Sequence, residues 1–180
     1  MLRISILKMK QEDRKTYEHY MDLALAEAHK ALDRGEFPVG CILECDGRVI
    51  ATGRRKGTRG ASPNEVDHAE MVLLRSLSNQ NPSPDLHRAR IFCTMEPCLM
   101  CYGAIILSGI GEIVYALEDV MGGGTGCDMA SLTPLYRQKV QIVPHVRRKE
   151  SLSLFKTFFS NSANRYWKDS LLARYTLESS

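Results

Sequence analysis

Apolar side chains recur every three or four positions along residues 15–34, and Gly35 follows this stretch. That spacing places the apolar side chains on one stripe and predicts an amphipathic helix that ends at the glycine. Two short apolar runs follow, at residues 39–43 and 48–51, and the Asp46-Gly47 dipeptide between them is typical of a type I′ turn. The first fifty residues therefore predict a helix followed by a β-hairpin.

The remaining chain alternates between strand-like and helical patterns. Three apolar runs have the length of buried strands, at residues 89–94, 112–117 and 140–143. Four stretches have helical spacing, at residues 68–77, 98–107, 150–159 and 165–177. A hairpin followed by strands that alternate with helices predicts a mixed five-stranded sheet between helical layers, an α/β fold of three α/β/α layers. We expect a single domain over residues 1–180.

The composition is that of an ordinary globular protein, since 44% of the 180 residues are apolar and 25% are charged. These values exclude a disordered or fibrous chain. No run of about 18 apolar residues is present and no secretory signal is evident, so we expect a cytoplasmic protein that makes no membrane contact. The net charge of +3 is mild, although Arg54, Arg55, Lys56 and Arg59 gather in one loop that faces either phosphate or water.

Two short motifs carry candidate chemistry, His68-Ala69-Glu70 and Pro97-Cys98-Leu99-Met100-Cys101, each at the start of a predicted helix. Residues i and i+3 share one helix face, so Cys98 and Cys101 direct both sulfur atoms to one point. The first turn of a helix favours the thiolate, which is the form that binds metals. Two thiolates and the His68 imidazole supply three ligands for one Zn²⁺ ion and leave the fourth position open for water, as in catalytic zinc sites.

Glu70 follows the histidine by two residues and is the candidate catalytic group. Because two thiolates offset the charge of the metal, the bound water needs a proton acceptor nearby. Glu70 is placed to accept that proton and to return it to a leaving amine. Each motif alone is weak, but together they match the H-x-E…P-C-x-x-C pattern of zinc-dependent nucleobase deaminases. The pattern predicts an enzyme that replaces the exocyclic amine of a nucleobase by a carbonyl oxygen and releases ammonia.

Four segments form a larger pattern: Glu36-Phe37-Pro38-Val39-Gly40, Asp46-Gly47-Arg48-Val49-Ile50-Ala51, His68-Ala69-Glu70 and Glu96-Pro97-Cys98-Leu99-Met100-Cys101-Tyr102-Gly103-Ala104. With these segments the chain resembles the cytidine and deoxycytidylate deaminase superfamily, in the branch of bacterial tRNA adenosine deaminases, guanine deaminases and fungal cytosine deaminase. The resemblance implies a cytidine-deaminase-like α/β/α fold and a homodimer. It also implies that His68, Cys98 and Cys101 bind zinc, that Glu70 transfers protons and that the Ala69 backbone contacts the base.

The chain departs from that branch after the hairpin. Members that act on adenosine or cytosine carry Gly-x-Asn there and bind the base with the amide, whereas this chain has Gly53-Arg54-Arg55. The Arg55 guanidinium offers only donors and cannot replace the amide as an acceptor. Either Asn64 in the following loop takes that role, or the substrate presents an acceptor or an anionic group to Arg55. Phe37 is a candidate for stacking on the base, the alternative being an ordinary core position.

The tail at residues 166–169, Tyr-Trp-Lys-Asp, is similar to the tail that closes over the base in fungal cytosine deaminase, so Trp167 and Asp169 are candidate substrate contacts. The helix expected over 165–177 is thus a candidate active-site cover. The alternative is that Trp167 lies on the buried face of that helix. A closing tail suits a small ligand, and Ala116-Leu117-Glu118-Asp119 differs from the Ala-Arg-Asp motif of tRNA adenosine deaminases. We therefore expect a free nucleobase or nucleoside as the substrate, with wobble-position adenosine in tRNA as the alternative.

Two other classes of protein contain a Cys-x-x-Cys pair. A non-catalytic zinc module needs a fourth cysteine or histidine ligand, for which Cys93, His87 and Cys127 are the candidates. A thiol redox protein leaves His68 and Glu70 without a role. A zinc-dependent deaminase explains the residues of both motifs and is the function predicted from the sequence.

Overall fold

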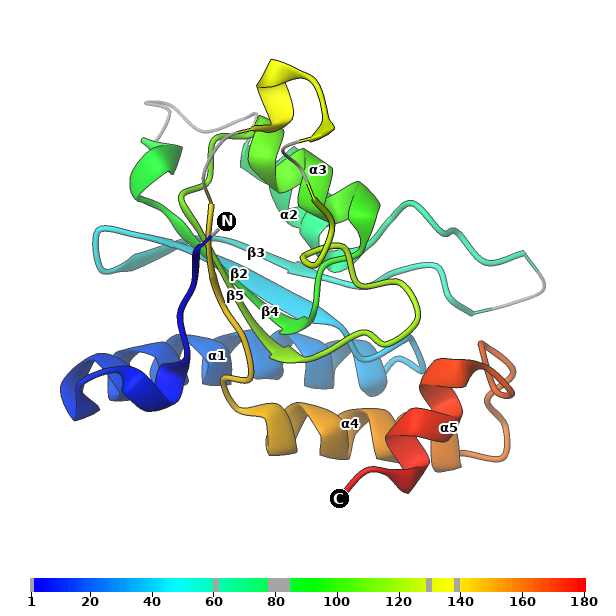
Figure 1. Cartoon of the computed structure of the whole chain (residues 1–180). Helices are drawn as coiled ribbons and strands as arrows, with labels where there is room; N and C mark the ends of the chain where they lie inside the picture. The colour runs from blue at the N-terminus through cyan, green and yellow to red at the C-terminus, as the bar shows by residue number, and fades with distance from the viewer. Residues whose placement is uncertain (1, 60–61, 78–84, 129–130, 138–139) are drawn as a thin grey trace.

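A central β-sheet with helices on both of its faces forms the computed structural model (Figure 1). The structure describes residues 2–59, 62–77, 85–128, 131–137 and 140–180. The strands are β1 (Leu2–Arg3), β2 (Gly40–Cys45), β3 (Arg48–Arg54), β4 (Arg90–Met95), β5 (Glu112–Leu117) and β6 (Gln141–Val143). The α-helices are α1 (Gln11–Leu32), α2 (Ala69–Leu77), α3 (Leu99–Leu107), α4 (Arg148–Ser160) and α5 (Leu171–Glu178). Short 3₁₀ turns lie at Ile6–Lys8, Leu86–Arg88 and Pro134–Tyr136.

The strand order across the sheet is β1-β6-β5-β4-β2-β3. β2 pairs antiparallel with β3 and β4, whereas β4, β5, β6 and β1 pair in parallel. The mixed sheet of the five predicted strands is therefore confirmed, and the two-residue strand β1 extends it at the β6 edge. At the tip of the β2–β3 hairpin, Asp46 and Gly47 have φ angles of 51° and 80°, as the predicted type I′ turn requires.

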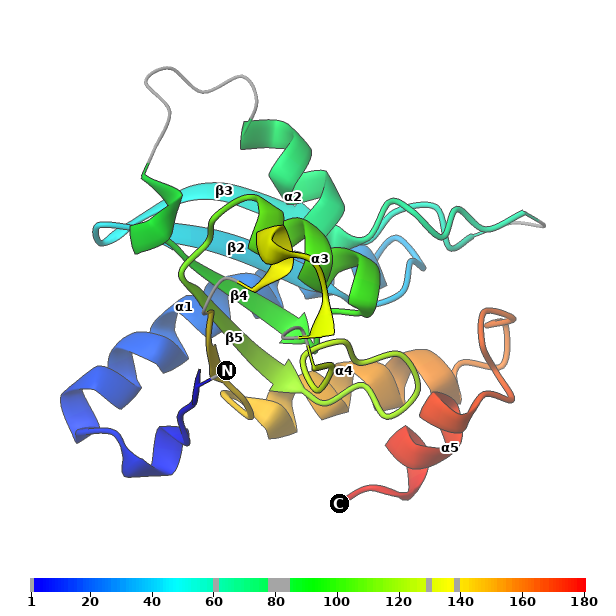
Figure 2. The same ribbon diagram turned by 45° about the horizontal axis from the view of Figure 1, so that its top comes forward.

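The helices form two layers, with α1 and α4 on one face of the sheet and α2 and α3 on the other (Figure 2). The α1 face is packed by side chains such as Tyr20, Met21 and Phe92, all of them buried. β4 and β5 are parallel, so their carboxyl ends meet at one edge of the sheet, where α3 begins directly after β4. Ligands of open α/β sheets bind at this edge. No helix in the described ranges combines the length and apolar content needed to cross a membrane.

The C-terminal segment differs from its prediction. The helix expected over 165–177 begins only at Leu171, because Ser170 caps it by accepting a hydrogen bond from the backbone N–H of Ala173. Trp167 has a φ of 51°, which is incompatible with a continuous helix through this position. The buried face of α5 consists of Leu172, Ala173 and Thr176. The alternative that placed Trp167 on this face is therefore wrong.

Candidate active site

His68, Cys98 and Cys101 meet at the edge of the sheet where α2 and α3 begin. His68 directly precedes α2, Cys98 is the N-cap residue of α3, and Cys101 lies in the first turn of α3. The His68 Nδ1 atom lies 3.5 Å from the Sγ atom of each cysteine. Cys101 is buried and the other two side chains are half-buried. The three predicted ligands are thus gathered at one point that is only partly buried.

The geometry of this cluster fits a zinc ion. Bond lengths of roughly 2.0 Å for Zn–N and 2.3 Å for Zn–S give a tetrahedron whose N···S edge is about 3.5 Å. The two N···S separations match that edge, and all three ligand atoms lie within 4.8 Å of one another. Across the part of the chain that the structure describes, the cluster includes neither Cys93, His87 nor Cys127. The closed four-ligand site of a structural zinc module is therefore not formed by these residues.

The two cysteines are electrostatically coupled. Hydrogen bonds from the Cys101 thiol and from His68 lower the pKa of Cys98 to about 4, although burial opposes the shift. The same hydrogen bond to Cys98 raises the pKa of Cys101. Cys98 is thus the more readily ionised thiol, as expected at the start of a helix. Metal binding requires the pair to give up the proton that remains on Cys101.

Glu70 lies in the first turn of α2 and is only 3% exposed. Together with His68 and Cys98 it lines a cavity of about 80 Å³ beside the cluster. Burial raises the pKa of the Glu70 carboxyl above its ordinary value. Such a carboxyl exchanges protons more readily near neutral pH. The cavity therefore brings together the candidate metal-binding cluster and the carboxyl that the sequence predicts to transfer protons.

The glycine-rich segment after β5 supports the turn that carries the cysteines. Gly123 forms an isolated β-bridge with Cys98, and the Gly124 N–H donates a hydrogen bond of 2.9 Å to the Pro97 carbonyl oxygen. A Cβ atom at Gly124 would lie 2.7 Å from the backbone nitrogen of Leu99. Only glycine permits this approach, so the loop fixes where α3 begins.

The start of α2 is fixed by another close approach. Ala69 is fully buried, and a Cβ atom at Gly53 of β3 would lie 2.2 Å from the Ala69 carbonyl oxygen. The absence of a side chain at Gly53 lets α2 pack directly on β3, which positions the flanking His68 and Glu70. The described lining of the cavity does not include Ala69, and its backbone contact with a base stays a prediction.

Of the two alternatives for reading the base, Arg55 lines the cavity and Asn64 does not. Arg55 is 3% exposed, and its Nη2 and Nη1 atoms donate to Glu65 Oε2 and to the Lys56 carbonyl oxygen, each at 3.1 Å. Asn64 is exposed, and its amide nitrogen donates to Asp67 Oδ2 at 2.8 Å. The Asn64 amide oxygen accepts backbone N–H groups of the same loop. Asn64 thus stabilises a turn, whereas Arg55 faces the site.

An aromatic wall closes the cavity on the side of the C-terminal segment. Trp167 stacks on Tyr166, with ring centroids 5.0 Å apart and an interplanar angle of 11°. Phe37 is buried and contacts both rings edge-on, at 5.4 and 5.7 Å, and it also packs against Phe158 of α4. Phe37 therefore belongs to the core and to the lining of the cavity at once. Asp169 is exposed and is not among the described lining residues.

Three lining residues with polar side chains are absent from the sequence prediction: Glu96, Asp119 and Tyr166. Glu96 directly follows β4, and Asp119 lies just after β5. The carboxyl ends of these two parallel strands lie at the same edge of the sheet, and this position could have identified both residues from the sequence. Burial raises the pKa of Asp119, whose carboxylate accepts two backbone N–H groups of its own loop. The Tyr166 hydroxyl donates to Glu65 Oε2 at 2.8 Å, a contact across 101 residues that no local pattern reveals.

Curated relatives extend over most of the chain. The tRNA-specific adenosine deaminase of Bacillus subtilis is 32% identical over 143 residues, which are 79% of this chain and 88% of that protein. The tRNA-specific adenosine deaminase of Agrobacterium fabrum is 34% identical over 143 residues, which are 78% of this chain and 92% of that protein.

Solved structures support the same relationship. A chain from studies of A-to-I editing by tRNA:A34 deaminases at the wobble position superposes with a TM-score of 0.62 and 31% identity, over 76% of this chain and 98% of that chain. Guanine deaminase from Nitrosomonas europaea has a TM-score of 0.64 at 19% identity, over 78% of this chain and 83% of that chain, which shows the shared fold.

A family model for the cytidine and deoxycytidylate deaminase zinc-binding region matches residues 14–117. This range contains His68, Glu70, Cys98 and Cys101. The cytidine-deaminase-like α/β/α fold and the zinc cofactor expected from the sequence are thereby confirmed. The chain belongs to the family of zinc-dependent cytidine and deoxycytidylate deaminases.

Proposed function

We propose that this protein is a hydrolytic deaminase that converts adenosine in tRNA to inosine. The observation that carries the proposal is the 32–34% identity to tRNA-specific adenosine deaminases over nearly four fifths of the chain. This substrate was the alternative from the sequence, where the C-terminal tail favoured a free base or nucleoside. The extent of the similarity to enzymes named for tRNA now outweighs that argument.

The residues at the cavity have separate roles in this reaction. A zinc ion held by His68, Cys98 and Cys101 supplies Lewis-acid activation of water when it is bound. Glu70 accepts a proton from the attacking water and delivers it to the departing amine, so that ammonia leaves and a carbonyl oxygen takes its place.

We assign recognition of the base to Arg55, Phe37 and Trp167, which line the cavity. Arg55 donates to an acceptor on the ring, and Phe37 and Trp167 contact its faces or edges. A cavity of about 80 Å³ is well below the roughly 300–1,000 Å³ of small-molecule sites, so a base enters only when the Tyr166–Trp167 turn moves aside. Base flipping into such a pocket is how deaminases reach a target atom.

A free purine base or a nucleoside is the second candidate substrate. The specific observation in its favour is the aromatic turn beside the cavity, where the stacked rings of Tyr166 and Trp167 form part of the lining. Arg55 also departs from the amide usual in relatives that act on adenosine, which favours a base that presents a carbonyl oxygen to the guanidinium.

A panel of substrates decides between the two candidates. Ammonia release is measured with deacylated tRNA, adenosine, adenine, guanine and cytosine, with the Glu70→Ala variant as the control for contaminating activity. Release from tRNA, with inosine appearing at one position, is the expected result. Release from a free base or nucleoside while tRNA stays unmodified would contradict the proposal and select the second candidate.

We also propose that the protein forms a homodimer and acts in the cytoplasm, where tRNA is found. The exposed apolar side chains of α3 support the homodimer, since Leu99 and Leu107 are 56% and 50% exposed. A mass measurement in solution at micromolar concentration tests it, and a monomer of 20.3 kDa would contradict it.

A further inference from the structure

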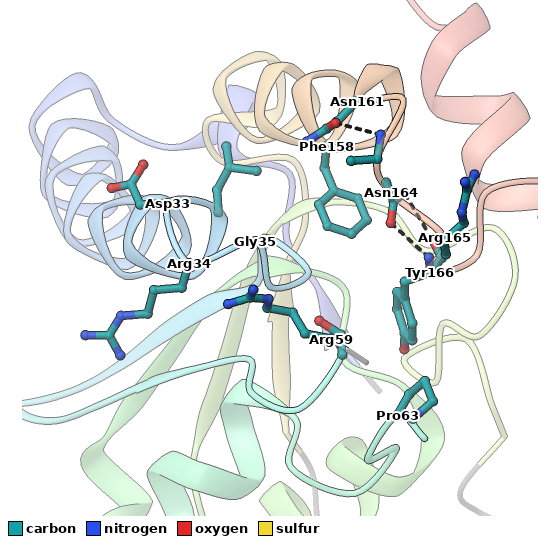
Figure 3. Close-up of a pocket in the computed structure, with 13 residues that line it drawn as sticks. Asp33, Arg34, Gly35, Arg59, Pro63, Phe158, Asn161, Asn164, Arg165 and Tyr166 are labelled. Carbon is teal, nitrogen blue, oxygen red and sulfur yellow. Dashed lines mark hydrogen bonds between the residues drawn. The ribbon is translucent and has the colours of Figure 1, made fainter. Parts of the chain in front are cut away.

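A second, much larger cavity lies beside the candidate active site. Its volume is about 910 Å³, which is within the range of ligand sites, and it is open on one side. It is formed where the end of α1, the loop after β3 and the segment after α4 meet (Figure 3). Arg34 and Arg59 lie on one side of it and Arg165 and Tyr166 on the other. We call this cavity the arginine groove.

The charge of the arginine groove favours an anionic ligand. Three arginines, Arg34, Arg59 and Arg165, line it together with a single acid, Asp33. Within the described residues, none of the three arginines forms an ion pair with a carboxylate. The charge of Arg59 helps to lower the pKa of the Glu36 carboxyl. That carboxylate already accepts two hydrogen bonds of 2.6 Å, from the backbone N–H and the hydroxyl of Thr58. Guanidinium groups without a protein partner are suited to bind phosphate.

The walls of the groove add apolar and aromatic surface to this charge. Phe158 and Tyr166 stand on one side, with Leu32 and Pro63 also in the lining. The segment that carries Tyr166 is held in place, because the Asn164 side chain hydrogen-bonds both the N–H and the carbonyl oxygen of Tyr166, at 2.9 and 3.2 Å. Aromatic surface beside arginines is the combination that binds single-stranded nucleic acid.

The position of the groove links it to the active site. Tyr166 lines both cavities, and Phe158 of the groove packs at 5.4 Å against Phe37 of the active-site cavity. The partition between the two cavities is therefore only one or two side chains thick. A ligand in the groove lies next to the base that reacts, as the neighbouring nucleotide of one RNA strand does.

We propose that the arginine groove binds the nucleotide adjacent to the target base in a single RNA strand, with its phosphate on Arg34 and Arg59 and its base against Tyr166. The inference rests on the proposed tRNA substrate, and it adds a site for the flanking nucleotide built from the α1 end and the segment after α4. Arginines beside an aromatic ring also suit a free mononucleotide, so the experiment distinguishes a free mononucleotide from an RNA strand.

Binding of a fluorescein-labelled RNA trinucleotide with adenosine at its centre is measured by anisotropy on the Glu70→Ala protein, which does not consume it. Adding Arg34→Ala and Arg59→Ala together should weaken binding about 10-fold or more, because each removes a charged contact. The salt dependence should fall by about 0.7 per lost phosphate contact. Arg48→Ala at the distant hairpin tip removes the same charge as either single groove substitution and should leave binding unchanged. Arg165→Ala serves as a second groove variant if the double variant unfolds.

Equal trinucleotide affinity in the groove variants and in the Arg48→Ala control would overturn the proposal. If adenosine monophosphate displaces the labelled probe at the same concentration as the unlabelled trinucleotide does, the proposal is also overturned, because the groove then binds a free nucleotide. If groove-dependent binding is found but no RNA releases ammonia with the wild-type protein, the groove stands and the proposed tRNA activity fails. If tRNA is deaminated and the groove variants retain full kcat/KM, the groove fails and the activity stands.

Discussion

The two cavities that meet at Tyr166 differ in size, in charge and in how they are built. The active-site cavity is about 80 Å³, and its chemical groups sit on the first turns of α2 and α3, held by backbone contacts at Gly53 and Gly124. The arginine groove is about 910 Å³ and is assembled from loops and the ends of α1 and α4. The proposed function thus places chemistry on rigid elements and recognition on loops, as is common in enzymes.

This division predicts two kinds of mutational effect. Changes at the metal cluster and at Glu70 should lower activity by the same factor on every substrate, because every substrate uses the same proton transfer. Changes at Arg55 or in the arginine groove should affect substrates unequally, because only some of them present a matching group. Each of the following variants tests one side of this comparison.

The largest effect is expected for Glu70→Gln. The amide keeps the shape of the side chain but cannot accept a proton, so kcat should fall about 10²- to 10⁴-fold on each substrate that the wild type accepts. Zinc content, measured by atomic absorption, should stay at one ion per chain, because Glu70 is not in the ligand cluster. Full ammonia release by a zinc-loaded Glu70→Gln protein would contradict the assigned role.

Gly124→Ala should reduce zinc affinity roughly 10- to 100-fold, as loss of supporting contacts around metal ligands typically does. The added methyl group would meet the Leu99 backbone at 2.7 Å and displace the turn that carries Cys98. Gly126→Ala is the matched control, since the nearest atom to a Cβ there is 4.0 Å away, at the end of the Arg3 side chain. Competition with a zinc chelator measures both affinities, and equal values would show that the loop does not fix the cysteines.

The sequence predicts the chemical centre well because its signals are local. His68 and Glu70 share one helix start, Cys98 and Cys101 share another, and the strand between them brings the two starts to one edge. The turn at residues 166–170 is different, since Trp167 has a left-handed backbone and its neighbour Tyr166 contacts Glu65 far along the chain. The apolar residues of this segment have helical spacing, which predicts a helix through the turn. The turn itself is specified by tertiary contacts that the local pattern does not reveal.

Arg55→Ala tests whether a loop residue of the active-site cavity recognises the base. The kcat/KM on the physiological substrate should fall roughly 10- to 100-fold, because a buried charged donor to the base is lost. Asn64→Ala is the control from the same loop and should change kcat/KM no more than about 2-fold, since the Asn64 amide bonds only within its own turn. A loss with Asn64→Ala and none with Arg55→Ala would reverse the assignment of the two residues.

The smallest effect is expected for Ser170→Ala, at the end of the turn that carries Tyr166 and Trp167. The Ser170 hydroxyl caps α5 by accepting the Ala173 N–H at 3.0 Å, and the Ser170 N–H bonds the Trp167 carbonyl oxygen at 3.0 Å. Removing the cap should lower the free energy of unfolding by about 1 kcal/mol, measured by denaturant titration of the zinc-loaded protein. Ser153→Ala, at an exposed position within α4, should leave it unchanged or raise it slightly. Equal stability of both variants would show that the cap does not hold α5, and the Trp167 turn would then depend on other contacts, such as those of Tyr166 with Glu65 and Asn164.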